Sequence, residues 1–420
     1  MFVVRSSGAF ALFRNACSVQ RPACRFLATK SYDPLRILFC GSDSFSIASL
    51  KALHAYSLQN PNHIASIDVV CRPGKRVGRG LKEIREGESS IKYPNWSSVA
   101  LTYSLPVPIK QVASDLSLPI HEINTFTGWT PPVTLNGPIN LIIAVSFGLF
   151  VPPRLLKEAT YGGLNVHPSI LPDLRGPAPL HHTLLAGRTT TGVTLQTLHH
   201  EKFDNGAILA QTPAPGFDIP NPESCTLDDL GKLVAPKGAN ILIEGIKNGL
   251  FVPPVKEVGW NCTDSKTLIH AGKIMPEDRH IDWMDWTMAD LNRHHRVLGN
   301  LWTKTLAEIK PGNGDGVESF SQKRMFITDF EEVDIPAGCE SFALVPGLPF
   351  TNASHPVGPK KGRELYVFTR DCKLLRINQV KVEGDKLAEG LRAAIKAHLF
   401  GDHSIKLGDA VFTPFRNPLA

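Results

Sequence analysis

Residues 141–145, Leu-Ile-Ile-Ala-Val, form an unbroken apolar run near the middle of the chain. Parallel strands that are buried on both faces have this pattern, whereas half-exposed strands alternate. Similar short runs occupy residues 35–40 and 67–70, and the residues from Phe45 to Ala55 have helical spacing. This alternation of strand and helix predicts an α/β domain with an open, mostly parallel, Rossmann-like sheet and helices on both faces.

Two further segments extend this domain toward residue 250. Residues 192–198 alternate between apolar and polar side chains, which favours a strand. Residues 230–250 have helical spacing, and Pro236 is expected to kink or end that helix because proline lacks the backbone N–H. We therefore expect the first domain to span residues 33–250.

The pattern changes after residue 250. Residues 251–265 begin with Phe-Val-Pro-Pro-Val, which is typical of a stiff, extended linker. Residues 266–299 are predicted to be helical, and residues 311–322 and 348–363 are expected to be long loops. Between these loops lie short β-rich runs, which predict a smaller OB-like β-barrel domain over residues 266–420. The runs are 301–309, 324–330, 364–369, 373–381 and 410–412.

The first 32 residues differ in composition from the rest. They hold five basic residues interspersed with apolar and serine residues, and the first acidic residue is Asp33. An Arg-rich, acid-free leader is typical of a mitochondrial transit peptide and predicts a mitochondrial matrix protein; a basic tail without a targeting role is the alternative. The whole chain has a formal net charge of +6, so the remainder is nearly neutral and bulk charge does not indicate a nucleic-acid partner.

Several classes of site are disfavoured by spacing. The eight cysteines show no Cys-x-x-Cys pairing, and the adjacent histidine pairs point apart on any regular backbone. We therefore predict no metal site. No apolar run is long enough to cross a bilayer, so no membrane insertion is expected. The turn at Gly41 lacks the glycine spacing of a dinucleotide-binding loop.

The segment 165–172, Asn-Val-His-Pro-Ser-Ile-Leu-Pro, holds the strongest candidate for chemistry. Asn165 and His167 are two residues apart, so on a strand both side chains lie on one face. An amide donor and an ionisable ring at a strand end can stabilise an oxyanion. Asp204, in the turn-prone sequence Asp-Asn-Gly, could orient or charge that ring. The alternative is a loop whose polar side chains only satisfy backbone groups.

Two basic features remain outside the leader. Residues 71–82, CRPGKRVGRGLK, contain five basic residues, three glycines and no acid, which is typical of a mobile loop that contacts phosphates. Residues 360–396 hold ten Lys or Arg against five Asp or Glu, which suits an RNA-binding face on a β-barrel. An ordinary solvated surface is the alternative for both features.

These residues together resemble the signature of the folate-dependent formyltransferases. The resemblance rests on Asn165-x-His167-Pro-Ser-Ile-Leu-Pro, on Arg175-Gly176 and on Asp204-x-Gly206. Within that family the chain is most similar to the branch that acts on charged initiator tRNA, because of the Gly-Arg-Gly at 78–80, the start at 36–41 and Ile-Asp-Trp at 281–283. The likeness covers residues 35–400 and is densest over 141–211.

The resemblance implies a specific set of roles. Asn165, His167 and Asp204 match the family's catalytic triad, and the co-substrate would be 10-formyltetrahydrofolate. The acceptor would be the methionine amine of methionyl initiator tRNA, in support of mitochondrial translation initiation, and the enzyme would be a monomer. The folate site would be formed by Phe147, Gly148, Leu149, Ser169, Ile170, Leu171 and Pro172. Contacts with tRNA would come from Arg76, Arg79, Lys82, Arg370 and Lys373.

Two other functions compete with this interpretation. One is a sibling folate-dependent formyltransferase or hydrolase with a small-molecule acceptor, against which the Gly-Arg-Gly loop and the additional domain argue. The other is a non-catalytic RNA-binding protein, against which the intact triad argues. Phe147 stands where the family usually has Tyr, and Pro168 where the tRNA branch commonly has Gly. Neither departure touches the proposed triad.

Overall fold

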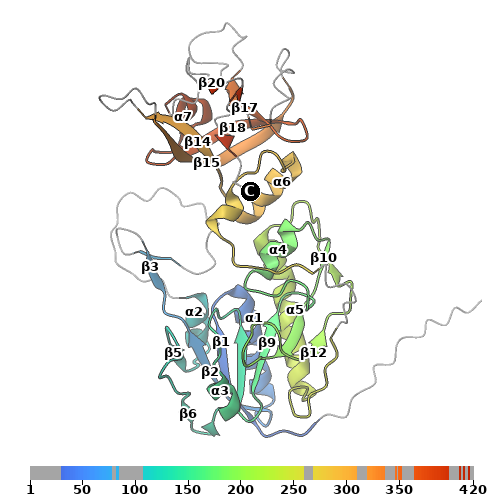
Figure 1. Cartoon of the computed structure of the whole chain (residues 1–420). Helices are drawn as coiled ribbons and strands as arrows, with labels where there is room; N and C mark the ends of the chain where they lie inside the picture. Colours follow the sequence, from blue (N-terminus) through green and yellow to red (C-terminus); the bar gives the residue numbers. More distant parts are fainter. Residues whose placement is uncertain are drawn as a thin grey trace, which may run out of the picture.

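In the computed structural model, the first and larger part of the chain is built on a seven-stranded sheet (Figure 1). The described residues are 30–77, 82–84, 107–259, 268–309, 319–335, 346–347, 349–351, 364–396, 406–407, 410–411 and 415–416. The proposed leader therefore lies outside them except for residues 30–32, as does Arg79.

The large sheet has the strand order β12-β11-β9-β8-β1-β2-β5. Its five parallel strands are β5 (Ile120–Glu122), β2 (Ile64–Cys71), β1 (Leu35–Gly41), β8 (Leu141–Val145) and β9 (Gly163–His167). Two antiparallel strands complete one edge, β11 (Thr194–Thr197) and β12 (Ile208–Gln211). The predicted mostly parallel, Rossmann-like sheet is confirmed.

Helices cover both faces of this sheet. Alternate residues of β1 enter two separate cores: Ile37 and Phe39 face one, whereas Leu38 and Cys40 face the other. The first core also receives side chains of α1 (Ser44–Gln59), α2 (Pro108–Asp115), α4 (Pro179–Leu185) and α5 (Leu227–Lys247). The second is closed by α3 (Pro153–Glu158). Burial on both faces explains the continuous apolar run of β8.

The C-terminal part is a second seven-stranded, antiparallel sheet, curled as the predicted barrel-like domain requires (Figure 1). Its path is β16-β17-β18-β15-β14-β22, and β19 pairs with β18. The bounds are β14 (Leu301–Ile309), β15 (Ser319–Val333), β16 (Pro349–Thr351), β17 (Leu365–Phe368), β18 (Leu374–Val382), β19 (Ala388–Glu389) and β22 (Phe415–Arg416). A 3-10 turn (Pro276–Arg279), α6 (Met288–Leu298) and α7 (Gly390–Lys396) accompany it.

Among the described residues, four short strand pairs lie outside the two large sheets. They are β3 (Lys75–Val77) with β4 (Lys82–Ile84), β6 (Val133–Thr134) with β7 (Gly137–Pro138), β10 (Thr190–Thr191) with β13 (Phe217–Asp218), and β20 (Lys406–Leu407) with β21 (Ala410–Val411). Within the described ranges, no helix is both long enough and apolar enough to cross a membrane.

Three predictions of local structure were wrong in whole or in part. Helix α5 does not end at Pro236, because it packs against α1: a Cβ on Gly238 would lie 2.9 Å from the Phe45 ring, and the kink at Pro236 stays a prediction. Most of the stretch 266–299 is not helical, since α6 begins only after its Thr287 cap. Of the expected loops at 311–322 and 348–363, residues 319–322 instead belong to β15 and residues 349–351 form β16, whereas the other residues of both stretches lie outside the described ranges.

Candidate active site

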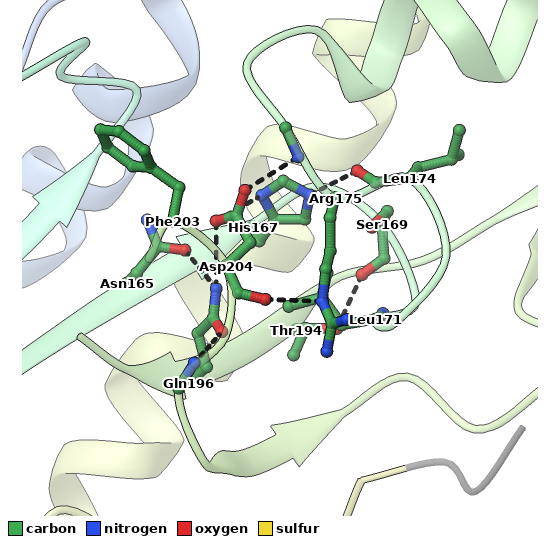
Figure 2. A network of polar contacts seen from close by, with 12 residues as sticks. Asn165, His167, Ser169, Leu171, Leu174, Arg175, Thr194, Gln196, Phe203 and Asp204 are labelled. Atoms are coloured by element: carbon green, nitrogen blue, oxygen red, sulfur yellow. Dashed lines mark hydrogen bonds and ion pairs between the residues drawn. The ribbon is translucent and has the colours of Figure 1, made fainter. Parts of the chain in front are cut away.

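The predicted catalytic residues meet at the carboxyl end of β9, where the parallel part of the sheet gives way to antiparallel β11. Ligands of open α/β sheets bind at this type of edge. Asn165 and His167 both belong to β9, and Asp204 lies on the turn between β11 and β12. Figure 2 shows the three side chains joined in one polar network.

His167 is held between two oxygen atoms. Its Nε2 donates to the Leu174 carbonyl at 2.9 Å, and its Nδ1 lies 3.4 Å from Asp204 Oδ1. The side chain is only 6% exposed. Because a carbonyl can only accept, Nε2 must carry a hydrogen. The Asp204 carboxylate would form an ion pair with the ring only when Nδ1 also carries a hydrogen.

Asp204 is fixed by backbone as well as by side-chain donors. Its φ of +53° lies in the left-handed region, which Asp and Asn tolerate best among non-glycine residues. The carboxylate accepts from the Gly176 N–H at 2.9 Å, and the Asp204 carbonyl accepts from Arg175 Nε at 2.8 Å. The turn can press onto β11 because residue 206 is glycine: a Cβ there would lie 1.7 Å from the Thr197 carbonyl oxygen.

Asn165 is linked to Asp204 through a residue that the sequence analysis did not single out, Gln196. The Gln196 Nε2 donates to Asn165 Oδ1 at 3.0 Å and to Asp204 Oδ1 at 3.2 Å. Asn165 Nδ2 in turn donates to the Ala144 carbonyl at 2.9 Å. In the sequence, Gln196 is one polar residue that alternates with apolar Leu195 on a predicted strand, and this pattern alone does not mark it as part of the site.

The residues proposed for folate binding divide into two groups. Leu171 and Pro172 line a cleft of about 360 Å³ beside Arg175 and Asp204. The other five residues do not line this cleft; they lie in the packed interior or in loops of the first domain. Ser169 is buried and donates to the Asp173 carbonyl at 2.7 Å, Ile170 lies against Gly192 and Gly216, and Phe147 packs on Phe126. Gly148 has a φ of +76°, and Leu149 packs against the second core.

The far wall of this cleft comes from the segment that follows α5. Glu257 and Gly259 line it, and the Val258 N–H donates to the Ile208 carbonyl of β12 at 2.9 Å. Phe251, at the start of the same segment, is only 2% exposed and packs on Tyr32 and Tyr161. The expected linker region thus contributes directly to the site.

The loop 173–178 connects the site to the C-terminal part. Residues 268–272, here named the junction segment, run beside this loop. The Leu174 N–H donates to the Ile269 carbonyl at 2.8 Å, and the Ala271 N–H to the Arg175 carbonyl at 2.7 Å. Gly176 has a φ of +126°, and a Cβ there would lie 2.3 Å from the Ala271 oxygen. One short loop therefore contacts both His167 and the second half of the chain.

None of the described residues that are proposed to contact tRNA takes part in the hydrogen bonds or ion pairs of this network. Arg76 and Lys82 belong to the hairpin of β3 and β4, and Arg79 lies outside the described residues. Arg370 faces Asp285 at 3.9 Å and Lys373 faces Glu332 at 2.9 Å, on the C-terminal part. All four side chains in these two pairs are largely exposed. No group of three or more His, Cys, Asp or Glu residues suited to a metal ion occurs in the part of the chain that the structure describes.

Comparison with known proteins identifies the family of this chain. A family model described as formyl transferase matches residues 136–244, the region that contains the whole triad. The mitochondrial methionyl-tRNA formyltransferase of Saccharomyces cerevisiae is 33% identical over 306 residues, which cover 66% of this chain and 72% of that protein. The mouse and human mitochondrial methionyl-tRNA formyltransferases are each 31% identical; the matches cover 69% and 66% of this chain.

The fold and the site define a formyl-transferring enzyme. This chain belongs to the methionyl-tRNA formyltransferase family. Its match spans 65% of the length of the mouse relative and 60% of the human one, which is less than two thirds of either.

Proposed function

We propose that this enzyme transfers the formyl group of 10-formyltetrahydrofolate to the amino group of methionyl initiator tRNA. The observation that carries the proposal is the polar network of Asn165, Gln196, Asp204 and His167 beside a cleft, in which His167 and Gln196 are buried. Family membership supports the formyl transfer and the tRNA acceptor. The same relatives are named mitochondrial, which together with the basic leader supports a place in the mitochondrial matrix.

The reaction requires stabilisation of negative charge on the formyl oxygen. The methionine amine attacks the formyl carbon, and the carbonyl electron pair moves onto the oxygen. Asn165 suits this charge, because an amide has two N–H donors and only one is needed by the Ala144 carbonyl. When the intermediate collapses, the carbon–nitrogen bond to the folate breaks and that nitrogen takes a proton.

Asp204 and His167 would supply the other half of the chemistry. The carboxylate holds the imidazolium charge next to the reaction, and a water between Asp204 and the substrate would accept the proton that the attacking amine loses. Arg175 fixes the position of this turn by its hydrogen bond to the Asp204 carbonyl. We propose no metal in this mechanism, since the chain's own donors supply the positive charge.

The tRNA is proposed to contact two regions. The basic loop around Arg79 follows β3 and lies close in sequence to the carboxyl end of β2. The C-terminal sheet, with Arg370 and Lys373 on solvent-exposed ion pairs, would hold the body of the tRNA. The proposed division is a catalytic domain over 33–250, a linker over 251–265 and a tRNA-binding domain over 266–420, acting as a monomer.

A formylation assay with three acceptors tests the proposal. Purified chain and 10-formyltetrahydrofolate would be mixed with Met-charged initiator tRNA, Met-charged elongator tRNA or glycinamide ribonucleotide. We expect formyl transfer to the initiator tRNA alone. Transfer only to the small amine would assign the chain to a sibling activity, and tRNA binding without any transfer would show a non-catalytic protein.

Two variants separate the proposed roles. His167→Ala should lower turnover far more than affinity for tRNA. Arg79→Ala should raise the KM for tRNA and leave the KM for the folate unchanged. An unchanged tRNA saturation curve for Arg79→Ala would refute the role of the basic loop without affecting the assignment of the triad.

A further inference from the structure

We infer that Gln196 is a positioning residue, which holds the Asn165 amide and the Asp204 carboxylate in their reactive orientations. The inference rests on the proposed function, because the orientations matter only if these two groups act on the formyl transfer. Gln196 lies on β11 directly opposite Asn165 of β9 in the antiparallel register. Figure 2 shows dashed lines from its amide nitrogen to both of these side chains.

All polar atoms of the Gln196 side chain are engaged. The two hydrogens of Nε2 match two acceptors, Asn165 Oδ1 at 3.0 Å and Asp204 Oδ1 at 3.2 Å. Its Oε1 accepts the Gly206 N–H at 3.2 Å. Gln196 is 1% exposed, so water cannot replace these partners without a structural change. A carboxamide fits this arrangement because it is both a double donor and an acceptor.

The contacts determine which way the Asn165 amide points. Gln196 requires an acceptor, and the Ala144 carbonyl requires a donor, so Oδ1 and Nδ2 are each assigned by a separate partner. The second hydrogen of Nδ2 then has a fixed direction, which is the condition for an oxyanion donor. The same Gln196 Nε2 shares Asp204 Oδ1 with His167, so it also limits rotation of the carboxylate.

Gln196→Met tests the inference because methionine keeps the length and apolar bulk but removes both donors. We expect kcat to fall about 10²-fold, the scale of a misoriented or lost oxyanion donor, while both KM values change little. Thr303→Val is the matched control. Thr303 is fully buried in the C-terminal sheet, and its hydroxyl accepts the Trp283 Nε1–H at 3.1 Å, so valine also removes a buried polar contact but leaves the candidate site intact. This variant should lose similar thermal stability and keep most of its kcat.

Gln196→Glu provides a readout that a purely structural role would not change. The carboxylate form cannot donate to Asn165 or Asp204, whereas the protonated form recovers one donor. The ratio of variant to wild-type kcat should therefore rise as pH falls from about 8 to about 6, because protonation restores a donor. A pH-independent ratio, or a Gln196→Met kcat within about three-fold of wild type, would overturn the inference. Wild-type protein that formylates no acceptor in the same assay would instead refute the proposed function.

Discussion

Asp204→Asn separates the charge of Asp204 from its shape. Asparagine has nearly the same volume and tolerates the left-handed backbone at this position as well as aspartate does. The Gly176 N–H still needs an acceptor, so the new amide oxygen should face Gly176 and the new amide nitrogen should face His167. That nitrogen would donate to His167 Nδ1 and so favour a neutral ring.

The expected loss can be estimated from the contacts that change. The variant replaces a carboxylate 3.4 Å from His167 by a neutral group, and it turns the contact with Gln196 into two facing donors. Loss of a positioned acid–base group typically costs about 10²–10⁴ in rate, which corresponds to about 3–5 kcal/mol in the barrier. The free energy of unfolding should fall by only about 1 kcal/mol, because the Gly176 hydrogen bond survives.

Single-turnover formylation at saturating tRNA and folate measures the chemical step, and thermal unfolding followed by circular dichroism measures the fold. Asp218→Asn is a suitable control, because Asp218 is exposed and lies on β13 away from the network. A single-turnover rate for Asp204→Asn within about three-fold of wild type would refute the argument that the charge of Asp204 is needed.

Three other perturbations have defined outcomes. Gly176→Ala should lower the free energy of unfolding by about 2–4 kcal/mol in urea and should also lower kcat in the formylation assay, because alanine adds a steric clash to an unfavourable backbone φ. Gly128 also has a positive φ but has open space around it, so Gly128→Ala should lose only the stability that the unfavourable φ costs. Burial lowers the pKa of His181 to about 4, so the unfolded chain binds a proton at this histidine at higher pH than the folded protein does. The free energy of unfolding should therefore decrease as the pH falls from about 6.5 toward 4. In His181→Gln, melting curves should show a smaller decrease over this pH range. Trp283→Phe should cost about 1–3 kcal/mol in urea unfolding, because it removes the buried hydrogen bond to Thr303; unchanged stability would contradict this.

The strands of the first domain were predictable because burial on both faces gives them a continuous apolar pattern. β8 agrees with its predicted bounds, and so does β14 in the second sheet. Pro236 was misleading, since local preference indicated a break that packing against Phe45 overrides. The extended junction segment was also missed, because its hydrogen bonds go to a loop about ninety residues earlier, which no local pattern encodes.

Part of the candidate site could also be predicted from a local pattern of the sequence. Spacing on one strand placed Asn165 and His167 on the same end of β9, and the structure brings Asp204 to them. Gln196 was not found, because its role depends on strand register, and a single glutamine in a strand has no distinctive local signal. The backbone acceptor of His167 could not be predicted either, since any residue at position 174 has a carbonyl.

The ladder between loop 173–178 and the junction segment limits how modular this enzyme is. The carbonyl of Leu174 orients His167, while the N–H of the same residue is bonded to Ile269. A chimera that exchanges the C-terminal part after residue 272 keeps these hydrogen bonds. A chimera divided at residue 260 loses the junction segment, and the backbone of Leu174 and Arg175 then lacks its partners in that segment. For the proposed role of His167, the boundary for recombining parts of this enzyme should therefore lie after residue 272, beyond the expected linker over 251–265.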